Sequence, residues 1–228
     1  MAQLITVEGG EFTGKTTVVV PALERIFRDA GKNVQASREP GGSPKAEKLR
    51  TEIFEKLRQG IPPEEQALLF NQARKVHLDD RMRPFLGEKK DKDTILILDR
   101  YLDSTRAYQG LEGGVSMETL KKLEVEYVGD FYPDLTFILY FPEEIFEKTL
   151  RERHEAANFS ATHDRSQVPF DLSDISVQIE RQRHHLKLPV IAKQFGEHRA
   201  FELINSAQNP EAVISEVKKS LKKCFPDI

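Results

Sequence analysis

Short apolar runs recur along the chain, and longer segments rich in charged residues separate them. Runs of this length that carry β-branched residues are typical of strands, whereas the longer segments have the spacing of helices. We predict strands in LITVEG near the start, NVQAS at 33–37, TILILD at 94–99, LTFILYF at 135–141 and AFELI at 200–204.

Two of the longer segments show clear helix signals. The segment 15–30 ends at Gly31, and the segment 143–156 follows Pro142 and opens with two glutamates, which suit the first turn of a helix. Two or three further helices separate the second strand from the third, across residues 44–92. Strands that alternate with helices predict an α/β fold, in which helices cover both faces of a parallel sheet.

The 228 residues are expected to form a single domain, because no repeat, low-complexity tract or linker divides the chain. One stretch, AANFSATHDRSQVPFDLS at about 156–173, is polar, contains a proline and has weak apolar periodicity. We expect a mobile loop there rather than a packed element.

Charge and composition limit the classes of function. The 34 basic and 37 acidic residues leave a formal charge of −3, so the sequence carries no electrostatic footprint for a nucleic-acid polymer. The single Cys224 excludes an intrachain disulfide, no secretion signal is evident, and no apolar run approaches the roughly 20 residues that cross a bilayer. We expect a cytoplasmic protein without a membrane role.

The six histidines and Cys224 lack metal-ligand spacing, and we expect His184 and His185 on the surface of a helix.

Residues 9–16, GGEFTGKT, match the pattern G-x-x-x-x-G-K-[ST] between a predicted strand and a predicted helix. Gly9 and Gly14 allow the tight turn that points backbone N–H groups at phosphate oxygens, and the helix start adds a favourable dipole. Lys15 can then reach the β and γ phosphates, and Thr16 can offer its hydroxyl to Mg²⁺. The competing interpretation is a Gly-rich turn that carries an ordinary surface lysine.

Three charged residues end or follow predicted strands on the side of this loop. In open α/β sheets the ligand crevice lies at the carboxyl ends of the strands, where Arg38 and Arg100 could hold the phosphate of an acceptor in line with the γ-phosphate. Asp99 ends a strand and is well placed to bind Mg²⁺ directly or through water. Surface ion pairs and a helix-capping aspartate are the competing interpretations of these residues.

Five motifs in order carry a resemblance to a known family: EGGEFTGKTT at 8–17, REPGGS at 38–43, LLFNQAR at 68–74, DRY at 99–101 and STRAYQG at 104–110. This set is similar to that of thymidylate kinases, closely over about the first 140 residues and loosely beyond. The resemblance implies a P-loop NTPase three-layer sandwich with a five-stranded parallel sheet, with ATP and Mg²⁺ as cofactors and dTMP as acceptor. It also implies a homodimer.

The resemblance assigns roles to residues. Phe70 would stack on the thymine ring and Arg74 would reach the base, and the two share one helix face because they are four apart. Phe70 could instead be buried in the core. Glu11 would lie near the 3′-hydroxyl of the acceptor. The polar wall of the base and sugar pocket would be Thr105, Tyr108 and Gln109. The residues expected to bind ATP are Gly9, Gly10, Glu11, Phe12, Thr13, Gly14, Lys15, Thr16 and Thr17.

The sequence departs from the family pattern in two regions. Phe12 stands where some members carry an arginine. The cation that stabilises the negative charge of the transferring phosphoryl group should therefore come from another segment. The lid segment, at about 150–173, is recognisable only from Arg151, Arg153 and His163-Asp164-Arg165. We expect Arg153 or Arg165 to join Lys15, Asp99 and Arg100 as catalytic residues. The loop beside the adenine would be Asn205-Ser206-Ala207.

Three further functions could use the same loop. A GTPase needs an N-K-x-D segment after a strand, and Asp91-Lys92-Asp93 precedes one and lacks the asparagine. A kinase for a different deoxynucleoside monophosphate would have the same loop, and so would an inactive interaction module.

The predicted reaction is direct in-line transfer of the γ-phosphoryl group from Mg-ATP to dTMP, which gives ADP and dTDP.

Overall fold

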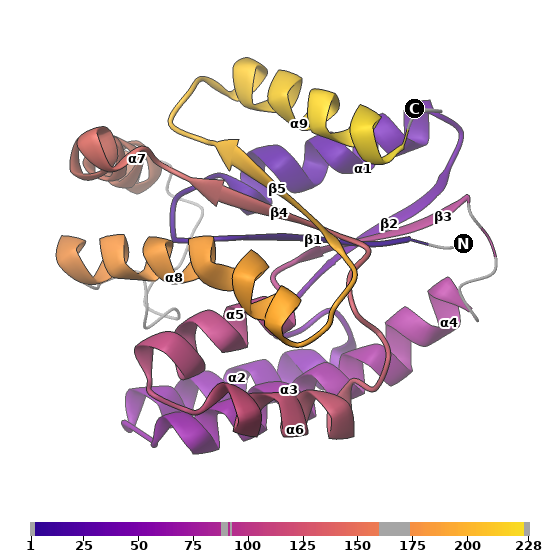
Figure 1. Ribbon diagram of the computed structural model, residues 1–228, viewed down its shortest axis with the longest axis vertical. Coiled ribbons are helices and arrows are strands. Elements are labelled where there is room, and N and C mark those ends of the chain that lie inside the picture. Colours follow the sequence, from indigo (N-terminus) through magenta and orange to yellow (C-terminus); the bar gives the residue numbers. More distant parts are fainter. Residues whose placement is uncertain (1–2, 88–90, 92, 160–173, 226–228) are drawn as a thin grey trace.

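The computed structural model describes residues 3–87, 91, 93–159 and 174–225. One parallel sheet runs through the centre of the molecule, in the order β2-β3-β1-β4-β5 (Figure 1). Its strands are β1 (Gln3–Gly9), β2 (Asn33–Arg38), β3 (Thr94–Asp99), β4 (Leu135–Tyr140) and β5 (Ala200–Asn205). The five predicted strands and the α/β fold class are therefore confirmed.

Helices cover both faces of the sheet, as Figure 1 shows. Above it in that view lie α1 (Val20–Asp29) and α9 (Pro210–Cys224), and against the opposite face lie α4 (Arg83–Leu86), α5 (Leu102–Thr105) and α8 (Ile175–Gln194). The helices of a further layer on that side are α2 (Pro44–Arg58), α3 (Pro63–His77) and α6 (Met117–Tyr127). The large helical crossover predicted between the second and third strands is thus present as α2, α3 and α4.

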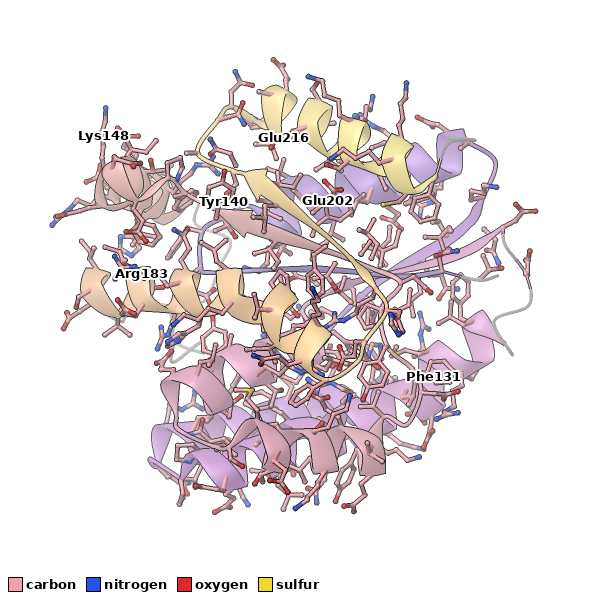
Figure 2. The ribbon with its side chains drawn as sticks, viewed as in Figure 1. Phe131, Tyr140, Lys148, Arg183, Glu202 and Glu216 are labelled. Carbon is pink, nitrogen blue, oxygen red and sulfur yellow. The ribbon has the colours of Figure 1, made fainter. Side chains whose placement is uncertain are left out.

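The strands read as continuous apolar runs because both faces of the sheet are buried. In β3, Ile95 and Ile97 pack into the cluster beneath α1 and α9. Leu96 and Leu98 point the other way and pack with residues of α4 and α5. Charged side chains such as Lys148 and Arg183 lie on the outer surfaces of helices (Figure 2).

The register of the sheet gathers the expected site at one edge. The Cα of Asp99 pairs with Arg38 on one side and with Val7 on the other, and Gly9 pairs with Leu139. The ends of β2 and β3 and the loop after β1 therefore lie side by side, as expected for parallel strands.

The predicted helix at 15–30 is divided in two. Lys15–Val19 form a π-helical turn, η1, in which the amides of Val18 and Val19 both donate to the carbonyl oxygen of Gly14 at 2.9 and 3.1 Å. Pro21, in the first turn of α1, has no amide hydrogen and its ring crowds a preceding carbonyl, which accounts for an irregular turn at this point.

The predicted helix at 143–156 begins with a 3₁₀ turn, Glu143–Ile145, and continues as α7 (Phe146–Phe159). The first residues of the predicted mobile loop are therefore helical, and the rest of that prediction, 160–173, falls outside the described residues. Among the helices that the structure describes, none has the length and apolar character that crossing a bilayer requires.

Candidate active site

The loop GGEFTGKT closes around the ammonium group of Lys15. Its Nζ donates to the carbonyl oxygens of Gly9 and Gly10 at 3.1 and 2.6 Å. Gly9 has a φ of 137°, and a Cβ there would lie 2.5 Å from the carbonyl oxygen of Leu139 in β4, so only glycine fits. Burial and the neighbouring Arg100 lower the pKa of Lys15. An anionic ligand in the loop would therefore be strongly attracted to this buried cation.

Two oxygen-bearing side chains, Thr16 and Asp99, meet where η1 adjoins the end of β3. The hydroxyl of Thr16 donates a hydrogen bond to the carboxylate of Asp99, which is only 8% exposed. Hydroxyl and carboxylate oxygens are the hard ligands that Mg²⁺ prefers, together with water and phosphate oxygens. The described residues include no group of three or more His, Cys, Asp and Glu side chains that could hold a metal. A cation here would thus take most of its ligands from water and a nucleotide.

Arg100 lies beside the phosphate loop in an unusual backbone conformation, with a φ of 66°. Its Nη2 donates to Glu11 Oε1 at 2.6 Å, and its Nη1 donates to the carbonyl oxygen of Gly9 at 3.2 Å. The hydroxyl of Tyr108 donates to the same oxygen of Glu11 at 2.9 Å. Burial lowers the pKa of Arg100, but Glu11 and other nearby acidic groups raise it by more, so the guanidinium stays charged.

Arg74 is held by four acceptors and is only 3% exposed. Its Nε donates to Glu39 Oε2 at 2.7 Å and its Nη1 to Asn71 Oδ1 at 3.0 Å. Its Nη2 donates to the carbonyl oxygen of Tyr101 and to Thr105 Oγ1, both at 3.1 Å. The direction of the guanidinium is thus fixed by the protein itself, which suits recognition of a planar group.

Phe70 lies at the boundary between a small apolar cluster and the cleft. Its ring packs against the small apolar cluster of Ile53, Phe54 and Ala73, and it also lines the cleft. Gln109, only 2% exposed, donates to Gln66 Oε1 at 3.1 Å and lines the same cleft. The α3 side of the cleft therefore offers an aromatic face beside fixed polar groups.

Two more arginines border the cleft. Arg38, at the end of β2, is exposed and its Nη2 donates to both carboxylate oxygens of Glu47 at 3.2 and 3.1 Å. Arg50 donates to the carbonyl oxygen of Pro40 at 2.7 Å, and its guanidinium lies 4.6 Å from the ring centre of Phe54. With Arg100, these side chains give the cleft a strongly basic wall.

The cleft has a volume of about 570 Å³, which suits a nucleotide-sized ligand. It joins the phosphate loop, the side-chain oxygens of Thr16 and Asp99, the basic wall and the aromatic face in one space. Its lining residues are Glu11, Phe12, Gly14, Lys15, Thr16, Thr17, Arg38, Glu39, Pro40, Arg50, Phe54, Phe70, Arg74, Asp99, Arg100, Tyr101, Ser104, Thr105, Tyr108, Gln109, Arg153 and Ala156.

Comparison with known proteins gives a consistent result. A family model described as thymidylate kinase matches residues 7–170. The thymidylate kinase of Mesoplasma florum is 34% identical over 218 residues, which cover 94% of this chain and 92% of that protein. This chain belongs to the thymidylate kinase family. The thymidylate kinase of Thermomicrobium roseum is 39% identical over 170 residues, 75% of this chain and 76% of that one. That of Bartonella henselae is 33% identical over 215 residues, 94% and 92% of the two chains.

Most of the expected site residues that the structure describes line the cleft, but three residues of the phosphate loop and the loop Asn205-Ser206-Ala207 do not. Gly9, Gly10 and Thr13 are buried behind its surface, where the hydroxyl of Thr13 donates to the carbonyl oxygen of Gly10 at 2.9 Å. They shape the loop rather than its open face. Arg165 lies outside the described residues, together with His163 and Asp164.

The two lid arginines that the structure describes differ in environment. Arg151 is exposed and pairs with Glu147 one turn before it on α7. Arg153 lines the cleft, and its Nη2 donates to the carbonyl oxygens of Ser206 and Gln208 at 2.8 and 3.2 Å. The loop expected beside the adenine is therefore joined to α7 by Arg153.

Arg50 was missed by the sequence analysis, although a signal for it exists. It precedes Phe54 by four residues, so the two share one face of α2, directly after the REPGGS motif that borders the cleft. An arginine on the apolar face of a helix is unusual and could have been recognised as a candidate ligand-binding residue.

The prediction that His184 and His185 lie on a helix surface is wrong for His185. That ring is fully buried against Tyr108, with 5.6 Å between the ring centres, and His184 is half-buried. Burial, and then the charge of Arg100, lower the pKa of His185 to about 3, so the ring is neutral. In the first half of α8, the side that faces the protein is polar, so a pattern based on apolar spacing does not identify it as buried.

Proposed function

We propose that the chain is an ATP-dependent kinase that transfers the γ-phosphoryl group of ATP to the 5′-phosphate of dTMP, giving ADP and dTDP. The observation that carries the proposal is the cleft, which joins a phosphate loop to a basic wall and to the Phe70 and Arg74 pair. Membership of the thymidylate kinase family supports the same acceptor.

At the donor end, the amides of the phosphate loop and the Nζ of Lys15 would bind the β and γ phosphates. Lys15 now donates to two carbonyl oxygens of its own loop, and phosphate oxygens would replace one or both of these weaker acceptors. Thr16 and Asp99 would hold Mg²⁺, which supplies charge neutralisation between the β and γ phosphates when bound.

At the acceptor end, Arg38 and Arg100 would hold the phosphate of dTMP, with Arg50 as a further candidate. Forked guanidinium groups fix the angle of a phosphate, so the attacking oxygen can be aligned with the γ-phosphorus. The carboxylate of Glu11 keeps Arg100 turned toward the phosphate loop at 2.6 Å. Catalysis would then depend on positioning and charge neutralisation.

The base would lie against Phe70, with Arg74 directed at its polar edge. Arg74 is already fixed by Glu39, Asn71, Tyr101 and Thr105, so binding costs little side-chain entropy. A wrong base would leave buried polar groups unpaired, which commonly gives strong discrimination.

An ADP-release assay with a panel of nucleoside monophosphates tests the proposal. We expect the highest kcat/KM for dTMP among dTMP, dCMP, dGMP and dAMP. We also expect the Lys15→Ala variant to stay folded while its turnover falls by a factor of about 10³ or more. Turnover of that variant within about threefold of wild type would contradict a kinase mechanism. A higher kcat/KM for another monophosphate would limit the proposal to a nucleoside monophosphate kinase.

The homodimer, the use of Mg²⁺ and cytoplasmic residence stay predictions from the family resemblance and the sequence. Size-exclusion chromatography with light scattering tests the first. The second is tested by assays in which EDTA removes divalent cations and added Mg²⁺ restores turnover, which we expect.

A further inference from the structure

Glu8 is a fully buried acidic residue at the end of β1, directly before the phosphate loop. Neither the motif analysis nor the proposed mechanism assigns it a role. A carboxyl group in this position is costly, because burial and the nearby Asp103 raise the pKa of Glu8 to about 7. A buried group of this kind needs a structural or functional explanation.

Both oxygens of the Glu8 carboxyl group reach the segment that follows β3. Oε1 accepts a hydrogen bond from the backbone amide of Tyr101 at 2.8 Å. Oε2 accepts from the hydroxyl of Ser104 at 2.7 Å, and Ser104 Oγ in turn accepts from Arg100 Nη1 at 3.2 Å. Glu8 is therefore connected to the guanidinium of Arg100 through one hydroxyl group.

The end of β1 fixes Arg100 at several points. The carbonyl oxygen of Val7 accepts from the backbone amide of Arg100 at 3.0 Å, and that of Gly9 accepts from Arg100 Nη1 at 3.2 Å. Glu8, between them, binds the next amide along the chain. Arg100 has a left-handed φ of 66°, a conformation that a residue with a side chain keeps only when its surroundings hold it there.

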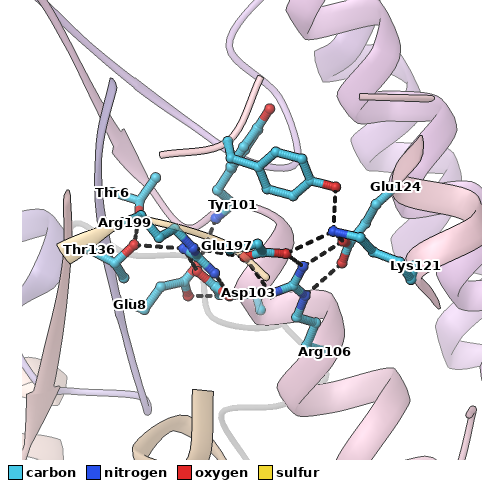
Figure 3. A network of polar contacts seen from close by, with 12 residues as sticks. Thr6, Glu8, Tyr101, Asp103, Arg106, Lys121, Glu124, Thr136, Glu197 and Arg199 are labelled. Atoms are coloured by element: carbon cyan, nitrogen blue, oxygen red, sulfur yellow. Dashed lines mark hydrogen bonds and ion pairs between the residues drawn. The ribbon is translucent and has the colours of Figure 1, made fainter. Parts of the chain in front are cut away.

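A larger polar network lies behind this contact (Figure 3). Asp103, beside Glu8, pairs with Arg199 at 2.5 and 2.7 Å, and Arg199 also donates to Thr136 at 2.9 Å. The hydroxyls of Thr136 and Thr6 lie 2.8 Å apart. Arg199 thus neutralises the negative charge of Asp103. Glu8 makes its own hydrogen bonds to Tyr101 and Ser104, in the segment that follows Arg100.

We propose that Glu8 is a positioning residue for phosphoryl transfer, which acts through Tyr101 and Ser104 to hold Arg100 in place beside the phosphate loop. The proposal rests on the proposed function, since it concerns the same site. A merely structural role, in which Glu8 only caps the start of α5, would lower stability without changing kinetic constants. The two roles are therefore separable by experiment.

The test compares four single variants and one double variant with wild type in steady-state kinetics and thermal unfolding. Glu8→Ala removes both contacts, whereas Glu8→Gln keeps an acceptor for Tyr101 and a polar partner for Ser104. Ser104→Ala removes only the connection to Arg100. Thr6→Val is the matched control, because it removes a buried hydrogen bond two residues earlier on the same face of β1.

We expect Glu8→Ala to lower kcat by about tenfold or more and to raise KM for dTMP, while Glu8→Gln stays within about threefold of wild type. Thr6→Val should lower the unfolding midpoint and leave both constants unchanged. The double variant Glu8→Ala/Ser104→Ala should lose little more than Glu8→Ala, because the two residues act in series. If Glu8→Ala does not fold, the test is the comparison of kcat and KM between Ser104→Ala and Thr6→Val.

Three results would overturn the proposal. The first is an unchanged kcat and KM in Glu8→Ala or in Ser104→Ala. The second is a decrease of kcat in Glu8→Gln as large as that in Glu8→Ala. The third is a decrease of kcat in Thr6→Val equal to that in Glu8→Ala. A wild-type protein without turnover of dTMP would overturn the proposed function first, and this proposal with it.

Discussion

Glu39 lies buried between two basic side chains of α3. Its Oε2 accepts from Arg74 at 2.7 Å, and its Oε1 accepts from His77 Nδ1 at 3.0 Å. His77 Nε2 lies 2.9 Å from Ser37 Oγ. The order serine, histidine and carboxylate matches that of hydrolytic triads, but a Cβ on Gly42 would lie 2.3 Å from Ser37 Oγ and 2.4 Å from the imidazole. The backbone of Gly42 thus blocks access of a substrate to Ser37 and His77. The carboxylate of Glu39 instead serves to orient Arg74.

Replacement of Glu39 by glutamine should therefore weaken binding of the base. The amide cannot accept from both neighbours, so Arg74 loses a charged partner in a buried site. We expect KM for dTMP to rise by about tenfold or more, with a smaller change in kcat. Steady-state kinetics checks this, with Glu65→Gln on the surface of the same helix as control. Equal KM values for the two variants would show that Arg74 needs no support from Glu39.

At the scale of elements, strands were predictable and irregular helices were not. β3 and β4 are buried on both faces, so most of their positions are apolar and the run is visible in the sequence. The π-helical turn at Lys15–Val19 is defined by which carbonyl oxygen accepts the hydrogen bond of each amide. The amino-acid composition does not determine this pairing.

Helix α8 shows why one side of the site escaped prediction. Its buried positions include Gln178, Arg181, Gln182 and His185, which an apolar pattern assigns to the surface. Gln182 accepts from the amide of Phe141 and donates to its carbonyl oxygen, both at 2.7 Å. Gln182 thus satisfies backbone groups beyond the end of β4, which need hydrogen-bond partners, and the neighbouring Arg181 pairs with Glu112 at 2.7 Å. Such needs arise only from the tertiary structure.

The contact between α7 and the loop after β5 leads to a prediction for the lid. Arg153 lines the cleft, whereas Arg151 points away and pairs with Glu147. A cation beside the γ-phosphoryl group stabilises charge that develops in the transition state, so Arg153→Ala should lower kcat by about a hundredfold and leave KM for dTMP almost unchanged. Arg151→Ala is the control, and we expect wild-type kinetics for it.

A different pattern would contradict this role for Arg153. If Arg153→Ala raises KM for ATP and leaves kcat unchanged, the side chain only holds the carbonyl groups of Ser206 and Gln208. The catalytic cation of the lid would then have to be sought at Arg165.

The buried network in Figure 3 joins α6, the π-helical turn Arg106–Glu112 and the segment before β5. Arg106 is fully buried and forms two ion pairs of 2.5 Å, with Glu124 and Glu197. Arg106→Met should lower the free energy of unfolding by about 3–5 kcal/mol, because both carboxylates stay buried without this partner. Urea unfolding measures the loss. The exposed Arg183, paired with Glu143, gives the control Arg183→Met, for which we expect an unchanged midpoint.

At the scale of the whole molecule, the sheet decides which distant residues meet. The net charge of −3 would not suggest a site for two polyanions. The register of β2, β3 and β1 nevertheless places Arg38, Arg100 and Lys15 around one cleft. Local attraction for phosphate therefore follows from topology rather than from overall composition.

The buried histidine of α8 couples the stability of the whole molecule to pH. His185 donates from Nδ1 to the carbonyl oxygen of Arg181 at 2.8 Å, while Nε2 has no hydrogen-bond partner among the described residues. Burial, then Arg100, and to a lesser extent Lys15 lower its pKa to about 3 from an ordinary value of 6.5, and Glu11 acts in the opposite direction. Protonation is therefore much easier in the unfolded chain than in the folded one.

The sign of the pH effect follows from this difference. Between pH 6.5 and pH 3 the unfolded chain binds the proton and the folded protein does not, so stability is full above pH 6.5 and falls as the pH is lowered. The raised pKa of Glu8 acts in the opposite direction between about pH 4.5 and 7, so a comparison of variants is needed to isolate the histidine.

His185→Phe keeps an aromatic ring against Tyr108 and removes the titrating group. From pH 7.5 to pH 5, the wild type should lose about 2 kcal/mol more of its unfolding free energy than this variant, since each pH unit below 6.5 contributes about 1.4 kcal/mol for one proton. Urea unfolding at the two pH values measures the difference, and His198→Phe, at a surface position, is the control. Equal losses in wild type and His185→Phe would mean that the folded protein accommodates a charged imidazole next to Arg100 and Lys15, and that the buried ring does not couple stability to pH.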